Sequence, residues 1–192
     1  MKETSEKEKL IQTTSQELFF KFGVKKVTVE EICSICKISK KTFYKYYSNK
    51  YELVKVLLDG YEVEDRKEFE IVKKEDLSFK QKLIKLMNLK LEKFNSAKGI
   101  FYRDIFENCT ELKSYVDQKI IDGDREFFEF VSHEQANKRL RTDVSARFIS
   151  YLLTKQANTM LFDPEMDKMF PDFNTKISKI YDSLLNGVGE GE

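Results

Sequence analysis

The sequence contains few of the residues that interrupt helices, with two prolines and seven glycines in 192 residues. Three of these glycines, Gly187, Gly189 and Gly191, fall together at the C-terminal end. Sandwiches and barrels of short strands need frequent turns, and turns are rich in glycine and proline. The scarcity of both residues therefore excludes an architecture of many short strands and favours long helices.

Several other classes of protein are excluded by what the sequence lacks. Its three cysteines cannot form the disulfide framework of a small secreted protein. No apolar run approaches the roughly 20 residues that span a bilayer, and the charged first residues do not resemble a signal peptide, so we expect a cytoplasmic protein. The sequence has one histidine, no Gly-rich phosphate loop and no identifiable nucleophile. We therefore expect that the protein is not an enzyme and that it has no cofactor or metal site.

Charge is abundant but unevenly distributed along the chain, whose overall net charge is only +1. Residues 1–50 contain eleven lysines and six acidic residues, a net charge of +5. The remainder contains 23 basic and 27 acidic residues, a net charge of −4. A basic head on an acidic body indicates that the head alone binds a polyanion, and chance scatter of charge is the alternative.

The first half of the basic segment has the spacing and end signals of two helices. Apolar residues at steps of four predict a helix over residues 5–22, and Gly23 is placed to end it. Thr28, followed three positions later by Glu31, forms a capping-box pattern. A second helix is therefore predicted to begin after Thr28.

The second half of this segment predicts two further helices. Ser39 can cap a third helix over residues 40–46, and Ser48 and Asn49 can cap a fourth. Two short helices separated by a tight turn within about twenty residues are typical of a helix-turn-helix.

The rest of the chain shows the apolar spacing of long helices. The predicted helices cover residues 77–96, 99–107, 110–139, 143–162 and 172–186. Residues 163–171 are predicted as a loop, with Pro171 in the opening turn of the last helix. We therefore predict an all-α fold of about nine helices.

The third predicted helix separates its residues into an inward and an outward side. At 100° per residue, Phe43 and Tyr47 fall on one side. The opposite arc holds Lys41, Thr42, Tyr44 and Lys45. This mixture of donors, positive charge and one aromatic ring suits a major groove lined by phosphates. The alternative is an ordinary small helix with solvated lysines and packed tyrosines.

Residues 28–53 resemble the DNA-binding signature of the TetR family of transcriptional regulators. The residues that fit directly are Thr28, Val29, Ile32, Ser39, Thr42, Phe43, Tyr44, Tyr46, Lys50 and Leu53. The resemblance implies a DNA-binding set of Thr28, Ser39, Lys40, Lys41, Thr42, Tyr44, Lys45, Tyr46 and Lys50. Within that set it implies phosphate contacts for Thr28, Thr42, Tyr44 and Lys50. Lysine donates to guanine O6 and N7, so we expect a guanine beneath Lys40 or Lys41.

Four positions depart from the family pattern. Cys33 and Cys36 stand where the family usually has alanine, Lys37 stands at the turn glycine, and Lys41 replaces a small residue. A lysine at the turn carries strain if its φ is positive. Cys33 and Cys36 also form a C-x-x-C pattern, for which buried packing, a zinc site and a redox pair are the alternatives. A structural zinc site needs four ligands, and the remaining candidates, Cys109 and His133, are distant in sequence. We therefore favour the interpretation that both cysteines are buried packing residues.

The resemblance also implies the organisation of the whole chain. Residues 1–48 would form the helix-turn-helix DNA-binding domain, and residues 49–192 a helical effector-binding and dimerisation domain. The aromatic residues expected to line an effector pocket are Phe94, Phe101, Tyr102, Phe106, Phe127, Phe130 and Tyr151, although core packing explains most such residues. The residues expected at the dimer interface are Phe148, Leu152, Ile177, Ile180, Tyr181 and Leu184.

These inferences lead to one principal hypothesis and two alternatives. The principal hypothesis is a homodimeric repressor that binds double-stranded DNA at a palindromic operator and is released by a small apolar effector. The first alternative is a ligand- or protein-binding module of the same fold in which DNA binding is secondary. The second is an all-helical enzyme, against which the lack of a catalytic set argues.

Overall fold

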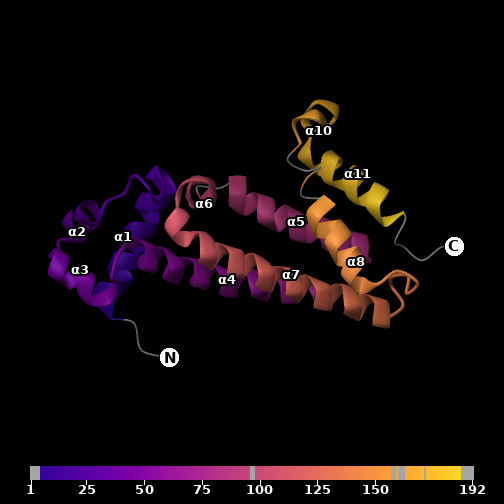
Figure 1. Ribbon diagram of the computed structural model, residues 1–192, viewed down its shortest axis with the longest axis horizontal. Coiled ribbons are helices and arrows are strands. Elements are labelled where there is room, and N and C mark those ends of the chain that lie inside the picture. Colours follow the sequence, from indigo (N-terminus) through magenta and orange to yellow (C-terminus); the bar gives the residue numbers. More distant parts are fainter. Residues whose placement is uncertain (1–4, 96–97, 157–158, 160–162, 171, 187–192) are drawn as a thin grey trace. The chain divides into compact units, whose positions relative to one another are not determined.

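The computed structural model describes residues 5–95, 98–156, 159, 163–170 and 172–186 (Figure 1). The chain divides into two compact units. Unit 1 comprises Met1–Lys67 and Leu91–Gln118, and unit 2 comprises Glu68–Lys90 and Lys119–Glu192. Every regular element of the described residues is a helix or a helical turn, and none is a strand. The predicted all-α fold is therefore confirmed.

Unit 1 contains the N-terminal helices together with a later pair. Its elements are α1 (Glu6–Phe22), α2 (Val29–Cys36), α3 (Lys40–Tyr46), the first part of α4 (Lys50–Lys74), α6 (Lys98–Asn108), the 3₁₀ turn η1 (Thr110–Leu112) and the start of α7 (Lys113–Ala136). Helix α1 packs against both α2 and α6, and α2 packs against α3. The predicted three-helix arrangement at the N-terminus is therefore present.

The predicted capping residues begin these helices. The side chains of Ser5, Thr28 and Ser39 each accept a hydrogen bond from a backbone N–H in the first turn of α1, α2 and α3. At Thr28 the bond is reciprocal, because the Glu31 carboxylate accepts the Thr28 backbone N–H at 2.7 Å. Asn49 caps α4 by accepting two backbone N–H groups of its first turn. Each such cap stabilises its helix by about 1 kcal/mol.

A single hydrophobic cluster joins the N-terminal helices of unit 1 to α4 and α6. Its largest fully buried side chains are Phe19, Phe43 and Phe101. The rings of Phe19 and Phe101 stack with centroids 6.2 Å apart, which ties α1 to α6. Burying one such ring contributes roughly 1.5–3 kcal/mol, so these three residues make a large contribution to holding the small helices in place.

Unit 2 contains the later helices. Its elements are the end of α4, most of α5 (Phe79–Asn95), the rest of α7, α8 (Ala146–Tyr151), the π turn η2 (Leu152–Gln156), α10 (Pro164–Met169) and α11 (Phe173–Leu185). Phe130 of α7 is fully buried in unit 2. The Phe130 ring contacts the rings of Phe69, Phe79 and Phe127 at centroid distances of 5.4–6.0 Å.

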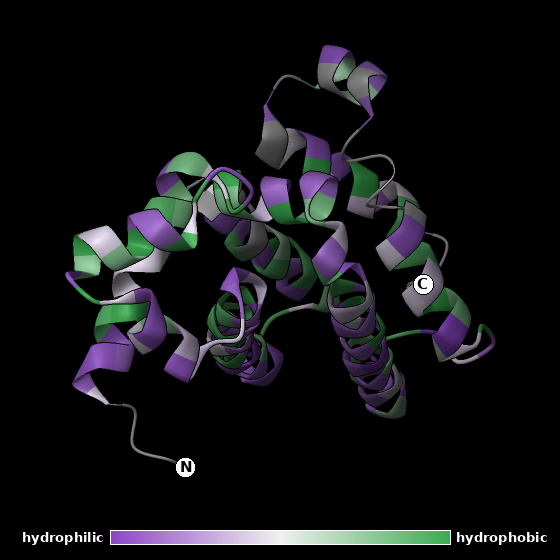
Figure 2. Cartoon of the chain, turned by 60° about the vertical axis from the view of Figure 1, so that its left-hand side comes forward, coloured by the Kyte–Doolittle hydropathy of each residue, from purple (hydrophilic) through white to green (hydrophobic). Residues whose placement is uncertain are grey.

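In both units the helices are amphipathic. In Figure 2 the long helices carry hydrophobic and hydrophilic bands along their length, and none is uniformly hydrophobic. Among the described residues, no helix combines the length and the apolar character needed to cross a membrane.

Three of the predicted boundaries are wrong. The predicted loop over residues 163–171 contains helix α10, because Asp163 caps it and Pro164 occupies its first position, where the missing N–H costs nothing. Pro171 lies outside the described residues. The predicted helix over residues 110–139 begins as the 3₁₀ turn η1 and ends at Ala136. The predicted helix over residues 143–162 starts at Ala146 and passes into the π turn η2.

Candidate nucleic-acid interface

The turn between α2 and α3 is closed by a lysine in the left-handed conformation. Lys37 has φ 52° and ψ 44°, so the positive φ at which a lysine carries strain is present at this turn. The Ile38 N–H donates to the Cys33 carbonyl at 3.0 Å, and the Lys37 N–H donates to the Ser34 carbonyl at 3.2 Å. These two bonds form a Schellman cap, which satisfies the last carbonyls of α2 and turns the chain into α3.

Helix α3 is anchored by the two aromatic residues predicted to face inward. Phe43 is 0% exposed and Tyr47 is 4% exposed, and their ring centroids lie 5.8 Å apart. The Tyr47 hydroxyl accepts a hydrogen bond from Gln12 Nε2 of α1 at 2.9 Å. The orientation of α3 is therefore fixed by packing on one side.

The opposite side of α3 faces solvent. Lys41, Tyr44 and Lys45 are exposed, with 51% of Tyr44 accessible, and Thr42 is half-buried. Two lysines and a tyrosine thus project from one short, anchored helix. This is the separation of sides that the sequence predicts, and contact with DNA stays a prediction for each of these residues.

Tyr46, at the end of α3, is half-buried and joined to the start of α1. Its hydroxyl accepts a hydrogen bond from Ser5 Oγ at 3.0 Å. Thr28 and Ser39 serve as the N-caps of α2 and α3, and the Ser39 and Thr42 hydroxyls lie 2.9 Å apart. Thr28 and Ser39 are exposed, so their hydroxyls sit at two helix N-termini that face solvent.

Lys40 is paired with a residue that sequence reasoning missed. Its ammonium forms an ion pair with Glu30 of α2, and both side chains are more than half exposed. The hydrogen bond from Lys40 lowers the pKa of the Glu30 carboxyl, and Glu30 raises the pKa of Lys40. The two residues are ten positions apart and lie on different helices, and the turn around Lys37 brings them together. A phosphate near Lys40 would compete with Glu30.

Lys50 forms hydrogen bonds to the backbone of the segment that connects α1 to α2. Its ammonium donates to the carbonyls of Val24 and Val27 at 2.8 Å and to that of Lys25 at 3.0 Å. An ammonium has three N–H donors, and all three are used here. The predicted phosphate contact of Lys50 would have to displace one of these carbonyls.

Cys33, Cys36 and Cys109 are free thiols buried in the cluster of unit 1. Burial raises the pKa of Cys33, and raises that of Cys109 to about 11. Low-pKa, accessible thiols are the reactive ones, so this environment favours packing over redox chemistry. Among the described residues, no cluster of potential metal-ligating side chains is found.

The residues expected to line an effector pocket fall into both units. In unit 1, Phe101 is buried and its ring lies 5.5 Å from that of Tyr102, while Phe106 is exposed. In unit 2, Phe127 packs on Phe130, and Tyr151 is exposed. The side chain of Phe94 lies outside the described residues.

The residues expected at the dimer interface differ in exposure. Ile177, Ile180 and Tyr181 of α11 are buried within a single chain, so they pack inside unit 2. Phe148 is 55% exposed, and Leu152 and Leu184 are half-buried. Only the last three residues offer surface to a second copy, and their place in an interface stays a prediction.

Comparison with known proteins agrees with this geometry. Residues 11–57, which span α1 to α4, match the family model of bacterial regulatory proteins of the tetR family. Two relatives are the HTH-type transcriptional regulators YuxN and YerO of Bacillus subtilis (strain 168), which are 29% and 28% identical over 71% and 96% of this chain. A crystal structure of a TetR-family transcriptional regulator from Cytophaga hutchinsonii superposes with a TM-score of 0.68 at 12% identity, covering 100% of both chains.

The chain therefore resembles the TetR family, in sequence over residues 11–57 and in fold over its whole length. The aligned regions span 41% of the length of YuxN and 66% of that of YerO. The matched family segment includes every residue from Ile11 to Leu57 and so contains the whole predicted DNA-binding set.

Proposed function

We propose that this chain is a homodimeric transcriptional regulator of the TetR family that binds a palindromic operator through α3. The observation that carries the proposal is the pairing of an anchored inner side with an exposed outer side on one short helix. Phe43 and Tyr47 hold the helix, while Lys41, Tyr44 and Lys45 remain free to contact DNA. The names of YuxN and YerO as HTH-type transcriptional regulators support the same function.

The physical basis of binding is electrostatic attraction combined with base recognition. The first 50 residues carry a net charge of +5, which draws this part of the chain to phosphates. The lysine ammonium groups can donate to phosphates or to guanine O6 and N7. We assign recognition of a guanine to Lys41, because both lysines are exposed but Lys40 is paired with Glu30.

The proposed regulator is a two-fold dimer whose binding to DNA is controlled by an effector. Residues 1–48 would bind DNA, and residues 49–192 would bind the effector and a second copy. In a dimer, the two α3 helices would lie one DNA turn apart, about 34–36 Å. A small apolar effector that binds one conformation more tightly than the other would shift the population away from the DNA-bound state and relieve repression.

Selection of bound DNA from a random pool tests the proposal and yields the operator. We expect a pseudo-palindrome whose affinity falls steeply with salt. Lys41→Ala should relax the preference at one position of each half-site, with a loss of about 1–3 kcal/mol for the preferred base. Lys179→Ala, which removes one exposed positive charge from α11, is the matched control and should leave binding unchanged.

Two outcomes would overturn this function. The first is failure to bind any sequence even at low salt. The second is tight binding of an apolar ligand without salt-dependent DNA affinity, which would instead identify a helical binding module. Light scattering after size exclusion tests the homodimer separately, and a single copy on the selected operator would contradict it.

A further inference from the structure

Two charged side chains from different helices hold the segment that connects α1 to α2. This segment, residues 23–28, receives Lys50 from α4 and Asp104 from α6. The Lys50 ammonium donates hydrogen bonds to the carbonyls of Val24, Lys25 and Val27. Three carbonyl oxygens around one ammonium form charge-assisted hydrogen bonds, which are stronger than neutral ones. The backbone of the segment is therefore fixed to the first turn of α4.

Asp104 holds the same segment through its N–H groups. Its Oδ2 accepts the Lys25 backbone N–H at 2.6 Å, and its Oδ1 accepts Asn108 Nδ2 at 2.8 Å. Gly23 has φ +82°, and a Cβ built at Gly23 would lie 2.9 Å from Asp104 Oδ2. The carboxylate therefore needs the absence of a side chain at Gly23 to reach Lys25. The result is one residue, Lys25, whose N–H is bound by α6 and whose carbonyl is bound by α4.

We propose that Asp104 and Lys50 are positioning residues for DNA binding, which together set the orientation of α2 and α3. This inference rests on the proposed function. Helices α2 and α3 follow directly on the held segment, so fixing the segment adds to the packing of Phe43 and Tyr47 in setting where the outer side of α3 points. A preorganised surface loses less conformational freedom on binding and so binds more tightly.

Asp104 gives the cleaner test of the two residues. Lys50 can itself bind phosphate, so a loss of affinity on its replacement has two explanations. A carboxylate cannot donate to phosphate, and removing one near DNA would by charge alone increase affinity. Weaker binding after loss of Asp104 therefore has to arise from positioning.

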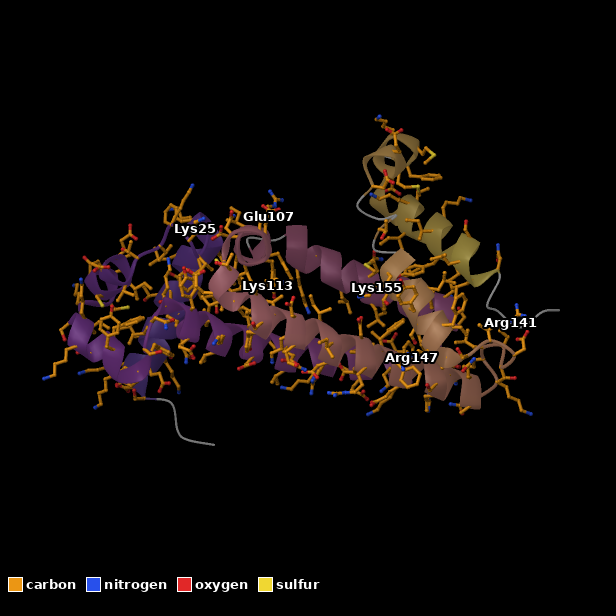
Figure 3. All side chains as sticks on the ribbon, viewed as in Figure 1. Lys25, Glu107, Lys113, Arg141, Arg147 and Lys155 are labelled. Carbon is orange, nitrogen blue, oxygen red and sulfur yellow. The ribbon has the colours of Figure 1, made fainter. Side chains whose placement is uncertain are left out.

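Glu107 provides a matched control on the same helix. It is an exposed carboxylate three residues after Asp104, and Figure 3 labels it together with Lys25. Asp104→Ala and Glu107→Ala each remove one negative charge from α6. Asp104→Asn keeps an oxygen acceptor and serves as the conservative variant, and also as the second variant if Asp104→Ala does not fold.

The experiment measures affinity for the selected operator by fluorescence anisotropy over a range of salt concentrations. We expect Asp104→Ala to bind roughly 5- to 100-fold more weakly than the wild type and Asp104→Asn to be intermediate. Glu107→Ala should bind as tightly as the wild type or slightly more tightly, because it removes only a negative charge. The slope of log affinity against log salt should stay unchanged, because no phosphate contact is lost. Affinity of Asp104→Ala equal to or above that of Glu107→Ala would overturn the proposal.

A second measurement needs no DNA. Hydrogen exchange of the Lys25 amide should accelerate at least roughly tenfold in Asp104→Ala and stay unchanged in Glu107→Ala. Unchanged exchange in Asp104→Ala would show that the carboxylate does not hold the segment. If the wild type binds no DNA, the proposed function fails, and faster exchange in Asp104→Ala would still support the hold on the segment.

Discussion

Lys82 of α5 and Glu134 of α7 form an ion pair that is completely shielded from solvent. Both side chains are 0% exposed, and Lys82 Nζ lies 3.2 Å from Glu134 Oε1. Lys82 also donates to the Lys73 carbonyl at the end of α4 at 2.9 Å, and Arg139 contributes to the neutralisation of Glu134 from the surface. Removing one partner of a buried pair leaves the other charge uncompensated, so such a pair is sensitive to substitution.

We expect Lys82→Met to lower the free energy of unfolding by about 3 kcal/mol, because Glu134 would lose its buried partner and keep only contacts from the solvent side. Lys80→Met is the matched control on the same helix. Lys80 pairs with Asp182 of α11 while both side chains are 38% exposed, so its loss should cost less than about 1 kcal/mol. Urea unfolding followed by circular dichroism measures both. Equal losses for the two variants would contradict this interpretation, and Lys82→Met/Glu134→Leu should recover part of the loss.

Two lysines in the left-handed conformation give a second prediction. Lys37 (φ 52°) and Lys138 (φ 57°) close α2 and α7 with the same pair of hydrogen bonds. Glycine adopts this conformation without steric cost but loses more entropy on folding. Lys37→Gly and Lys138→Gly should each raise the free energy of unfolding by about 0.5 kcal/mol, and Lys45→Gly inside α3 should lower it by about 1 kcal/mol. A thermal or urea melt that shows destabilisation at both turns would refute the argument.

The pair between Glu30 and Lys40 predicts the effect of a charge change near DNA. Glu30→Gln removes the carboxylate that occupies Lys40, so Lys40 becomes available to a phosphate. We expect affinity for DNA of any sequence to increase about fivefold at low salt and the increase to shrink at high salt. Glu17→Gln, which removes an exposed carboxylate from α1, is the control for net charge. An equal gain in both variants would mean that the pair with Lys40 has no specific effect.

Tyrosine burial predicts how stability depends on alkaline pH. Desolvation, followed by a hydrogen bond to Glu111, raises the pKa of Tyr51 to about 12. In the unfolded chain the hydroxyl titrates near pH 10, so the stabilisation is complete below about pH 10 and is lost as pH rises toward 12. Tyr51→Phe should therefore make the urea midpoint fall less steeply over this window. An absorbance titration at alkaline pH in which Tyr51→Phe loses a step near pH 10 rather than pH 12 would contradict the assignment.

Local signals in the sequence predicted the N-terminal helices well. Thr28 and Ser39 cap helices through atoms within three residues, so their patterns carry the whole interaction. Glu30 with Lys40, and Asp104 with Lys25, join residues 10 and 79 positions apart, and no local pattern records them. Residues 163–171 do carry a local pattern, but that pattern fits two structures. Asp163 and Pro164 are equally typical of a turn and of a helix start, so the sequence did not distinguish a loop from α10.

The apolar residues of unit 2 show a second limit of sequence reasoning. Helical spacing identifies which residues share a face, but it does not say whether that face meets another helix of the same chain or a second copy. Ile177, Ile180 and Tyr181 meet their own chain, while Phe148 remains exposed. Burial against the same chain and burial against a second copy give the same periodic pattern of apolar residues.

The burial of all three native cysteines has a practical consequence for experiments on this protein. Thiol-reactive dyes attack the accessible thiolate, which Cys33, Cys36 and Cys109 do not present in the folded chain. A single cysteine introduced on the surface can therefore be labelled selectively without first replacing the native ones. A spin label on α3 would then report the separation of the two recognition helices in an assembled pair, with and without DNA.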